Sequence, residues 1–438
     1  MRPNRLPVIL FATAVLLMAG SVLWLMWELQ GESAVKADIS QAQRSPKSAP
    51  LAVPAVMPQP LNVTVATPSP VVEKSSASPV IATLNGPGSM PNEVLLTFRT
   101  PEALAAFRDR TAGLGLEVIG YDVKLRTARV RFRDTTALER DLNAHADDYT
   151  HFGPNLITRI PGLPPPAAAT DATNAGGRTP FRSQGLEAIG ASGDRSGWGQ
   201  GVIVAVIDSG VSNHPSLANA QITHYDLVND GSAFNGHGTA MASLIAGNDP
   251  NVGGVSPAVK LLDIRVADTN GESNTALLST AIVKATDLGA RVINISLGAA
   301  GDSPMLNEAV RYAQSRNVVV VAAAGNEQQT SLSMPAGIPG VLSVGAVDAN
   351  GTQAYFSNSG AGLTLVAPGV GIVSGYTDDK LVIGSGTSQA TAITSGAVAY
   401  LLGRGYYGPN IIPLLTRTAA PLQAPVTAVG AGLIQLPK

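Results

Sequence analysis

The sequence has no cysteine among its 438 residues. This absence excludes disulfides, thiol nucleophiles, cysteine-based zinc sites and iron–sulfur clusters. Charged side chains are also scarce, at 14% of the chain, against roughly a quarter in ordinary globular domains. The formal net charge of −2 leaves no basic surplus, and phosphate recognition requires a concentrated basic surface. No nucleic-acid partner is therefore expected.

Apolar residues, in contrast, reach 45% of the chain, and 46 glycines are present. That composition excludes a wholly disordered chain, which would combine low hydrophobicity with high net charge. The length gives room for about two or three domains.

The N-terminus predicts a membrane anchor. Arg2 and Arg5 precede residues 6–27, which contain no charged side chain. As a helix these residues would be about 33 Å long, enough to cross a hydrocarbon core of about 30 Å. A cleaved signal peptide is the alternative, although its apolar region is usually shorter. The early arginines predict that the remainder is exported, and is either anchored on the periplasmic or extracellular face or released after processing.

Composition divides the rest of the chain. Residues 31–89 are rich in Pro, Ser and Ala and are predicted to form a disordered tether. Residues 91–160 indicate the order β-α-β-β-α-β, a unit that carries no function by itself. Residues 161–180 are predicted to be a linker exposed to proteolysis. Residues 181–438 alternate strands and helices, which favours an α/β fold with a mostly parallel sheet.

Four polar side chains stand where elements of this last region begin or end. Asp208 and Asn326 each follow an apolar strand, His237 lies between two glycines before an apolar helix, and Ser388 lies near the start of another helix. Ligands bind outside the carboxyl ends of parallel strands, and the unpaired N–H groups of a helix start favour negative charge. Each residue taken alone could equally be a turn or cap residue.

Taken together, the four residues predict acyl-transfer chemistry. Asp208, His237 and Ser388 occur in the order Asp…His…Ser, which is the order of the serine triad in subtilisin. Asp208-Ser209-Gly210 could also be an aspartic-protease motif, but that chemistry needs a second, facing carboxylate. No second D-[ST]-G occurs in the sequence.

The sequence resembles the subtilisin-like serine peptidases. The resemblance is carried by VAVIDSGVSNHPSL, NGHGTAMASLIAG, VINISLG, VVAAAGNE and GSGTSQATA, and weaker matches extend it over about residues 181–438. It implies a subtilisin-like α/β fold, a mostly parallel sheet flanked by helices. Residues 91–160 then look like the family's N-terminal propeptide, a small ferredoxin-like α+β domain that acts as an intramolecular chaperone and inhibitor.

The resemblance also implies roles for single residues. Ser388 would be the nucleophile, His237 the general base and Asp208 its partner, while Asn326 and the backbone N–H of Ser388 would form the oxyanion hole. The residues expected to bind substrate are Ser296, Leu297 and Gly298 along the substrate backbone, and Ala323, Ala324, Gly325 and Pro335 around its side chain.

The implied activity is that of a serine endopeptidase acting on proteins or peptides, made as a membrane-anchored zymogen. The small apolar lining of the side-chain pocket favours an apolar substrate residue, or a basic one if Glu327 reaches the pocket. The chemistry requires no cofactor and no metal. The loop 247–255 is short and poor in carboxylates, so a strong structural calcium site is not expected.

Three positions depart from the family's motifs. Gln389 stands in place of the usual Met, Ala392 in place of Pro, and Ala240 in place of a second His. These departures motivate an alternative function, a catalytically weak or inactive protease-like binding module at the membrane surface.

Overall fold

The computed structural model of the chain describes residues 84–111, 113–161 and 177–437. The chain divides into two units, Met1–Pro68 and Ser69–Lys438, and the described residues all belong to the second. The expected anchor at 6–27 and nearly all of the expected tether lie outside the described residues. Within the described ranges, no helix combines the length and apolar composition that a membrane crossing requires.

A small N-terminal module comes first, with its elements in the order β-α-β-β-α-β. They are β1 (Ser89–Phe98), α3 (Pro101–Arg110), β2 (Leu116–Asp122), β3 (Thr127–Phe132), α4 (Thr135–Ala144) and β4 (Tyr149–Arg159), with a 3-10 turn, η1 (Ala146–Asp148), before β4. The four strands are antiparallel in the order β2-β3-β1-β4. Thr100 and Asp134 cap the two helices by accepting from backbone N–H groups of the first turn, as N-cap residues do.

A seven-stranded sheet forms the centre of the larger, C-terminal domain. Its order is β12-β11-β10-β9-β5-β7-β6, and every pairing in it is parallel. The strands are β5 (Ile203–Asp208), β6 (Gln221–Asp226), β7 (Lys260–Arg265), β9 (Val292–Ile295), β10 (Val319–Ala323), β11 (Leu342–Val347) and β12 (Leu365–Pro368). The predicted α/β fold with a mostly parallel sheet is confirmed.

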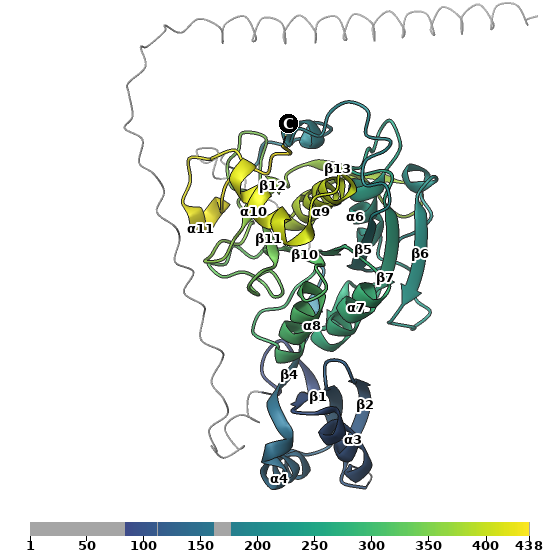
Figure 1. Cartoon of the computed structure of the whole chain (residues 1–438), viewed down its shortest axis with the longest axis vertical. Coiled ribbons are helices and arrows are strands. Elements are labelled where there is room, and N and C mark those ends of the chain that lie inside the picture. Colours follow the sequence, from purple (N-terminus) through teal and green to yellow (C-terminus); the bar gives the residue numbers. More distant parts are fainter. Residues whose placement is uncertain (1–83, 112, 162–176, 438) are drawn as a thin grey trace, which may run out of the picture. The chain divides into compact units, whose positions relative to one another are not determined.

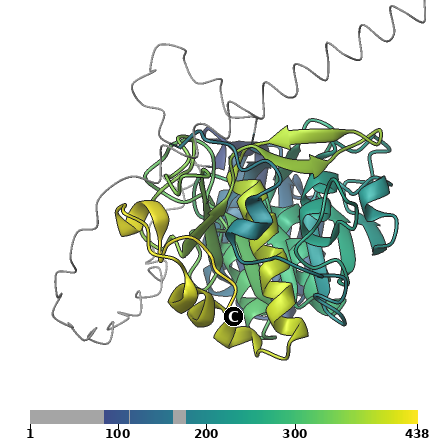
Figure 2. The same ribbon diagram turned by 90° about the horizontal axis from the view of Figure 1, so that it is seen from above.

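Helices cover both faces of this sheet (Figure 1 and Figure 2). On one face lie α6 (His237–Ala246), α9 (Thr387–Gly403) and α10 (Gly408–Thr418), and on the other lie α7 (Thr275–Asp287) and α8 (Pro304–Gln314). Because both faces are covered, the central strands are continuous runs of Val, Ile and Ala rather than alternating sequences.

The remaining elements are short. They are α5 (Gly185–Ala188), η2 (Pro215–Leu217), β8 (Glu272–Asn274), the antiparallel pair β13 (Ile372–Gly375) and β14 (Leu381–Gly384), and α11 (Val426–Val429). Strand β8 pairs with β4 of the small module, so the module's sheet has a fifth strand from the C-terminal domain.

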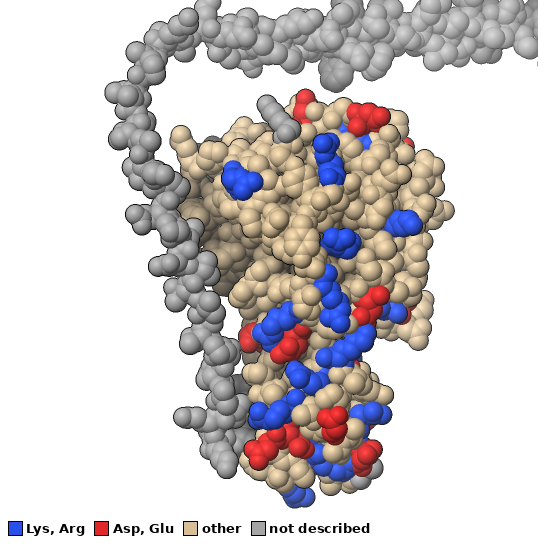
Figure 3. Space-filling view, viewed as in Figure 1, with Lys and Arg blue, Asp and Glu red and all other residues tan. Residues whose placement is uncertain are grey.

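Charged side chains are distributed unevenly over these parts. In the view of Figure 3 they gather over the small module, whereas much of the C-terminal domain on that face is uncharged.

Candidate active site

Asp208 and His237 lie together at the edge where the parallel strands end. Asp208 is the last residue of β5 and is fully buried, and His237 is the first residue of α6. The imidazole Nδ1 lies 2.9 Å from each carboxylate oxygen of Asp208. Asp208 Oδ1 also accepts from the backbone N–H of Ser209 at 2.8 Å. The carboxylate is thus fixed on both sides, and it fixes one nitrogen of the ring.

Two glycines allow the chain to approach closely around His237. Gly236 has a φ of +93°, and a Cβ there would lie 2.6 Å from the ring of Tyr376. A Cβ on Gly238 would lie 2.5 Å from the carbonyl oxygen of Gly210. The turn before α6 is therefore clamped between Tyr376, whose hydroxyl donates to the Asn235 carbonyl at 2.6 Å, and the turn that follows Asp208.

Ser388 is the second residue of α9, so its backbone N–H belongs to the unpaired first turn. Its hydroxyl donates to the backbone carbonyl of Ser296, at 3.2 Å. Among the hydrogen bonds of the described residues, none joins this hydroxyl to His237. The helices whose first turns contain these two residues pack on the same face of the sheet.

Asn326 is held against the start of α9. Its Oδ1 accepts from the backbone N–H of Thr387 at 2.9 Å and from the Thr387 hydroxyl at 2.8 Å. A Cβ on Gly386 would lie 3.1 Å from the Asn326 Nδ2. With its oxygen engaged by Thr387, the amide presents its N–H groups beside the turn that carries Ser388. Such a carboxamide can stabilise negative charge that develops near Ser388.

The residues expected to line the side-chain pocket have polar neighbours. Ala323 and Ala324 are buried and Gly325 follows them, but a Cβ on Gly325 would lie 2.6 Å from Glu327 Oε2 and 2.5 Å from Ser333 Oγ. The Asn358 Nδ2 donates to that Glu327 oxygen at 2.8 Å. The carboxylate therefore does reach Gly325, and the lining of alanine and glycine alone is incomplete. Pro335 follows Met334, whose backbone is paired with Ala299.

The segment expected to bind the substrate backbone, Ser296 to Gly298, follows β9. Its last residue is paired with Arg159 at the end of β4. Arg159 N–H donates to Gly298 O at 3.0 Å, and Gly298 N–H donates to Arg159 O at 3.2 Å. On its other side Arg159 is paired with Glu272 in β8, and Ile160 N–H donates to Gly271 O at 2.9 Å. The end of β4 therefore lies as a strand between residues 271–274 and Gly298.

The departures from the family's motifs fall in two settings. Ala240 and Ala392 are buried core residues of α6 and α9, so these two departures change how the helices pack in the core. Gln389 follows Ser388 and is 8% exposed. Its amide lies in the space that a side chain on Gly384 or Gly386 would fill.

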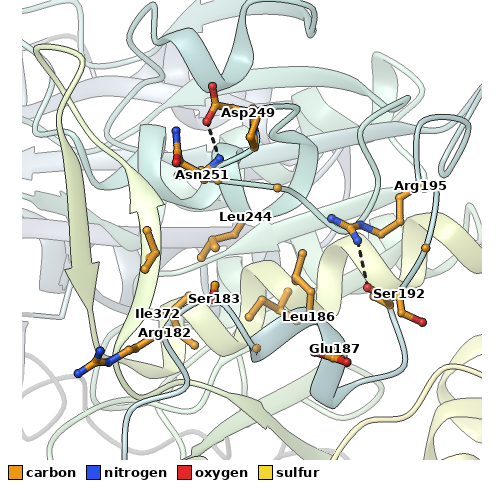
Figure 4. A pocket seen from close by; sticks show the side chains of 18 residues that line it. Arg182, Ser183, Leu186, Glu187, Ser192, Arg195, Leu244, Asp249, Asn251 and Ile372 are labelled. Atoms are coloured by element: carbon orange, nitrogen blue, oxygen red, sulfur yellow. Dashed lines mark hydrogen bonds between the residues drawn. The ribbon is translucent and has the colours of Figure 1, made fainter. Parts of the chain in front are cut away.

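A separate cavity of about 500 Å³ lies away from these residues (Figure 4). Arg195 lines it and donates to the backbone carbonyls of Ala191 and Gly254, both at 3.2 Å. Burial lowers the pKa of Arg195. A guanidinium thus already supplies positive charge to the loop 247–255. Among the described residues, no group of three His, Cys, Asp or Glu could hold a metal, and the expectation about calcium stays a prediction.

Two contributors to the site's geometry were missed from the sequence. Ser209 Oγ accepts from the Gly238 N–H at 3.2 Å and so ties the Asp208 turn to α6. Tyr376 follows β13, about 140 residues from the turn it supports. Nothing local in the sequence indicates the contact of Tyr376 with Asn235. The hydroxyl of Ser209 could have been considered, because Ser209 directly follows Asp208 in the motif.

Comparison with known proteins assigns the family. The family model described as "Subtilase family" matches residues 199–432, which is more than half of the chain. The chain is 39% identical over 223 residues to the thermophilic serine proteinase of Bacillus sp. (strain AK1), covering 49% of this chain and 56% of that protein. It is 35% identical over 228 residues to thermitase of Thermoactinomyces vulgaris, covering 50% of this chain and 82% of thermitase.

A solved structure extends the likeness. The crystal structure of fervidolysin from Fervidobacterium pennivorans, a keratinolytic enzyme related to subtilisin, matches with a TM-score of 0.68 and 25% identity. The match covers 80% of this chain and 61% of fervidolysin. The family match over more than half of the chain shows that the chain belongs to the subtilase family. The predicted family is confirmed, while the chain spans only about half the length of some relatives that it matches.

Proposed function

We propose that this chain is a serine endopeptidase in which Ser388 is the nucleophile, His237 the general base and Asp208 the partner of the imidazole. The observation that carries the proposal is the contact of His237 Nδ1 with the Asp208 carboxylate, whose two oxygens each lie 2.9 Å from that nitrogen. It fixes the tautomer that leaves Nε2 to accept a proton. The 15% exposure of the His237 side chain leaves the ring accessible to substrate.

In the proposed reaction, Ser388 Oγ leaves the Ser296 carbonyl and turns toward His237, which takes its proton as Oγ attacks the scissile carbonyl. Catalytic hydrogen bonds are often loose before substrate binds. The Asn326 amide and the Ser388 N–H then hold the oxyanion of the tetrahedral intermediate. His237 returns its proton to the leaving amine, and water releases the acyl group by the same route. No step needs a cofactor.

We further propose that substrate binds as an added strand on Ser296–Gly298, a mode in which main-chain bonds give affinity. The two-way pairing of Arg159 with Gly298 supports this mode, because the chain's own backbone already pairs there as substrate would. The carboxylate of Glu327 beside Gly325 supports a basic or polar residue before the scissile bond, in preference to the apolar one that the alanines suggest.

The small module is proposed to be an intramolecular inhibitor, and the whole chain a zymogen. Its last strand fills the position proposed for substrate, and Asn155 Oδ1 accepts from the Thr275 hydroxyl and the Ala276 N–H at the start of α7. The fervidolysin match supports the pairing of the two parts. Its 80% coverage of 438 residues, about 350, exceeds what residues 181–438 alone can supply.

Membrane anchoring through residues 6–27 is proposed from the sequence, with the catalytic domain outside the cytoplasm. Cleavage in the linker 161–180 would separate that domain from the anchor, so that maturation would also release it.

The experiment that tests the proposed chemistry is labelling with a fluorophosphonate probe, which reacts only with an activated serine. The mature wild-type chain should be labelled, and Ser388→Ala should not. Ser385→Ala is the matched control and should label normally, because the Ser385 hydroxyl instead accepts from Gly371 N–H at 2.9 Å. A wild-type chain that folds, is mature and remains unlabelled would favour the inactive binding module.

A further inference from the structure

A second carboxylate–imidazole pair lies beside the first. Asp263, in β7, is fully buried, and its Oδ2 lies 2.6 Å from the His224 Nδ1. His224 is the residue of β6 directly opposite Asp263 in the parallel register. Its side chain is 41% exposed. An Asp within the apolar strand KLLDIR is expensive to bury unless it is paired, and the proposed reaction makes no use of it.

The strand register brings this pair close to Asp208. Asp263 is opposite Val206 in β5, and Asp208 is two residues further along the same strand. Side chains two residues apart share a face of the sheet. Neighbouring strands lie about 4.8 Å apart and rise about 3.3 Å per residue, so the Cα atoms of the two aspartates are about 8 Å apart. Burial raises the pKa of Asp263, and the negative charge of Asp208 adds to the rise.

Asp263 also holds the turn that follows Asp208. The same Oδ2 accepts from the Val211 N–H at 2.9 Å. The centroid of the Phe234 ring lies 5.3 Å from that of the His224 ring, and the same ring occupies the space where a Cβ on Gly210 would be. The turn 208–211 is therefore fixed at one end by Asp208 and at the other by Asp263.

The turn 208–211 also contacts the start of α6. Ser209 Oγ accepts from the Gly238 N–H, and Gly238 follows His237. A continuous set of contacts thus joins His224 and Asp263 to the proposed general base. The other charged groups around the pair are Arg265 of β7, which bonds to Asp226 of β6 and to Asp230, and whose guanidinium lies over the Phe234 ring.

We infer that the Asp263–His224 pair is an ion pair that positions the turn 208–211 and adjusts how readily His237 holds its proton. Given the proposed function, the two residues are positioning residues for the catalytic base. A negative charge near His237 favours the protonated imidazole. When His224 is protonated, its charge offsets that of Asp263, so removing the two partners one at a time should shift the protonation of His237 in opposite directions.

The test is an NMR titration of the His237 imidazole in the full chain carrying Ser388→Ala, which prevents self-digestion. The His237 signal is identified by its loss in His237→Gln. Asp263→Asn removes the charge but keeps an acceptor for Val211, and should move the titration midpoint down by roughly half a pH unit. His224→Gln leaves Asp263 uncompensated and should move the midpoint up by a similar amount.

Glu308→Gln is the matched control, because it removes one negative charge from α8 on the opposite face of the sheet. Shifts in the same direction, or shifts no larger than this control, would overturn the inference. If Asp263→Asn fails to fold, the upward shift in His224→Gln still decides, since His224 is on the exposed edge strand.

The positioning role has its own readout. Asp263→Ala removes the acceptor for Val211 as well as the charge, so Ser388 in the active chain should react with a fluorophosphonate about tenfold more slowly than in Asp263→Asn. Equal rates would contradict positioning. A wild-type chain that never labels would contradict the proposed function instead, and the titration result would stand independently of it.

Discussion

The amide of Asn326 is held with its oxygen toward Thr387, at 2.9 and 2.8 Å, and its nitrogen is therefore free to donate to an oxyanion. Asn326→Ala should lower kcat by about 100- to 1000-fold with little change in KM, a range that was measured on subtilisin itself. Steady-state kinetics on a peptide substrate checks this. A 100- to 1000-fold rise in KM with unchanged kcat would mean that Asn326 contributes to substrate binding and not specifically to stabilising the transition state.

The proposed preference for a basic substrate residue depends on Glu327. Its carboxylate is held beside Gly325 by the Asn358 amide at 2.8 Å, so substrates with Lys or Arg before the scissile bond should be favoured. Glu327→Gln should reduce kcat/KM for such substrates by about two- to fivefold relative to a Leu substrate. Gln329→Glu, which adds a carboxylate at an exposed position two residues away and leaves Glu327 in place, is the control. An unchanged Lys-to-Leu ratio in Glu327→Gln would show that Glu327 does not contact the substrate.

At the scale of elements, Glu93 of β1 connects the small module to the C-terminal domain. Its carboxylate accepts from Arg129 at 2.7 Å and from the Asn155 amide at 2.8 Å, and the oxygen of that amide accepts from the Ala276 N–H in the first turn of α7. Burial alone would raise the pKa of Glu93, but the bonds from Arg129 and Asn155 and the charges of Arg129 and Arg131 lower it below 4.5.

A lowered pKa means that Glu93 stabilises the module fully above pH 4.5, and that this contribution is lost as the pH falls through the lower, folded value. In the full chain with Ser388→Ala, thermal unfolding of the module should therefore become easier below pH 4.5. Glu93→Gln should remove most of this dependence and destabilise the module by about 2 kcal/mol at neutral pH. An unchanged pH dependence in Glu93→Gln would assign the acid sensitivity to other carboxylates.

Elements also show what the sequence can predict. Strand β5 and helices α6 and α9 follow from local patterns, because buried parallel strands are apolar runs and because glycines precede both helices. The pairing of β4 with β8 joins Arg159 to Glu272, more than 100 residues apart, and the contact of His224 with Asp263 depends on the register of two strands. No local propensity encodes such contacts, so the second carboxylate–imidazole pair was not predicted, and the position of the Glu327 carboxylate was left open.

At the scale of the whole molecule, the small module and the C-terminal domain share a sheet, and the last strand of the module lies between residues 271–274 and Gly298. The residues that follow, 162–176, connect this strand to Gly177 and lie outside the described part of the chain. If the module is an inhibitor that the enzyme removes, the first bond cut should lie between about Pro161 and Arg182. The product would then lack residues 6–27, and cleavage would release the catalytic domain.

The most direct test is the mass and N-terminal sequence of the purified protein, compared between the wild type and Ser388→Ala. The proposed zymogen predicts that the wild type yields a fragment of about 260 residues that begins between Pro161 and Arg182, and that Ser388→Ala remains uncut there. A wild-type chain that hydrolyses peptide substrates while remaining intact at that position, or a Ser388→Ala chain cut there in the same way, would contradict self-processing by Ser388.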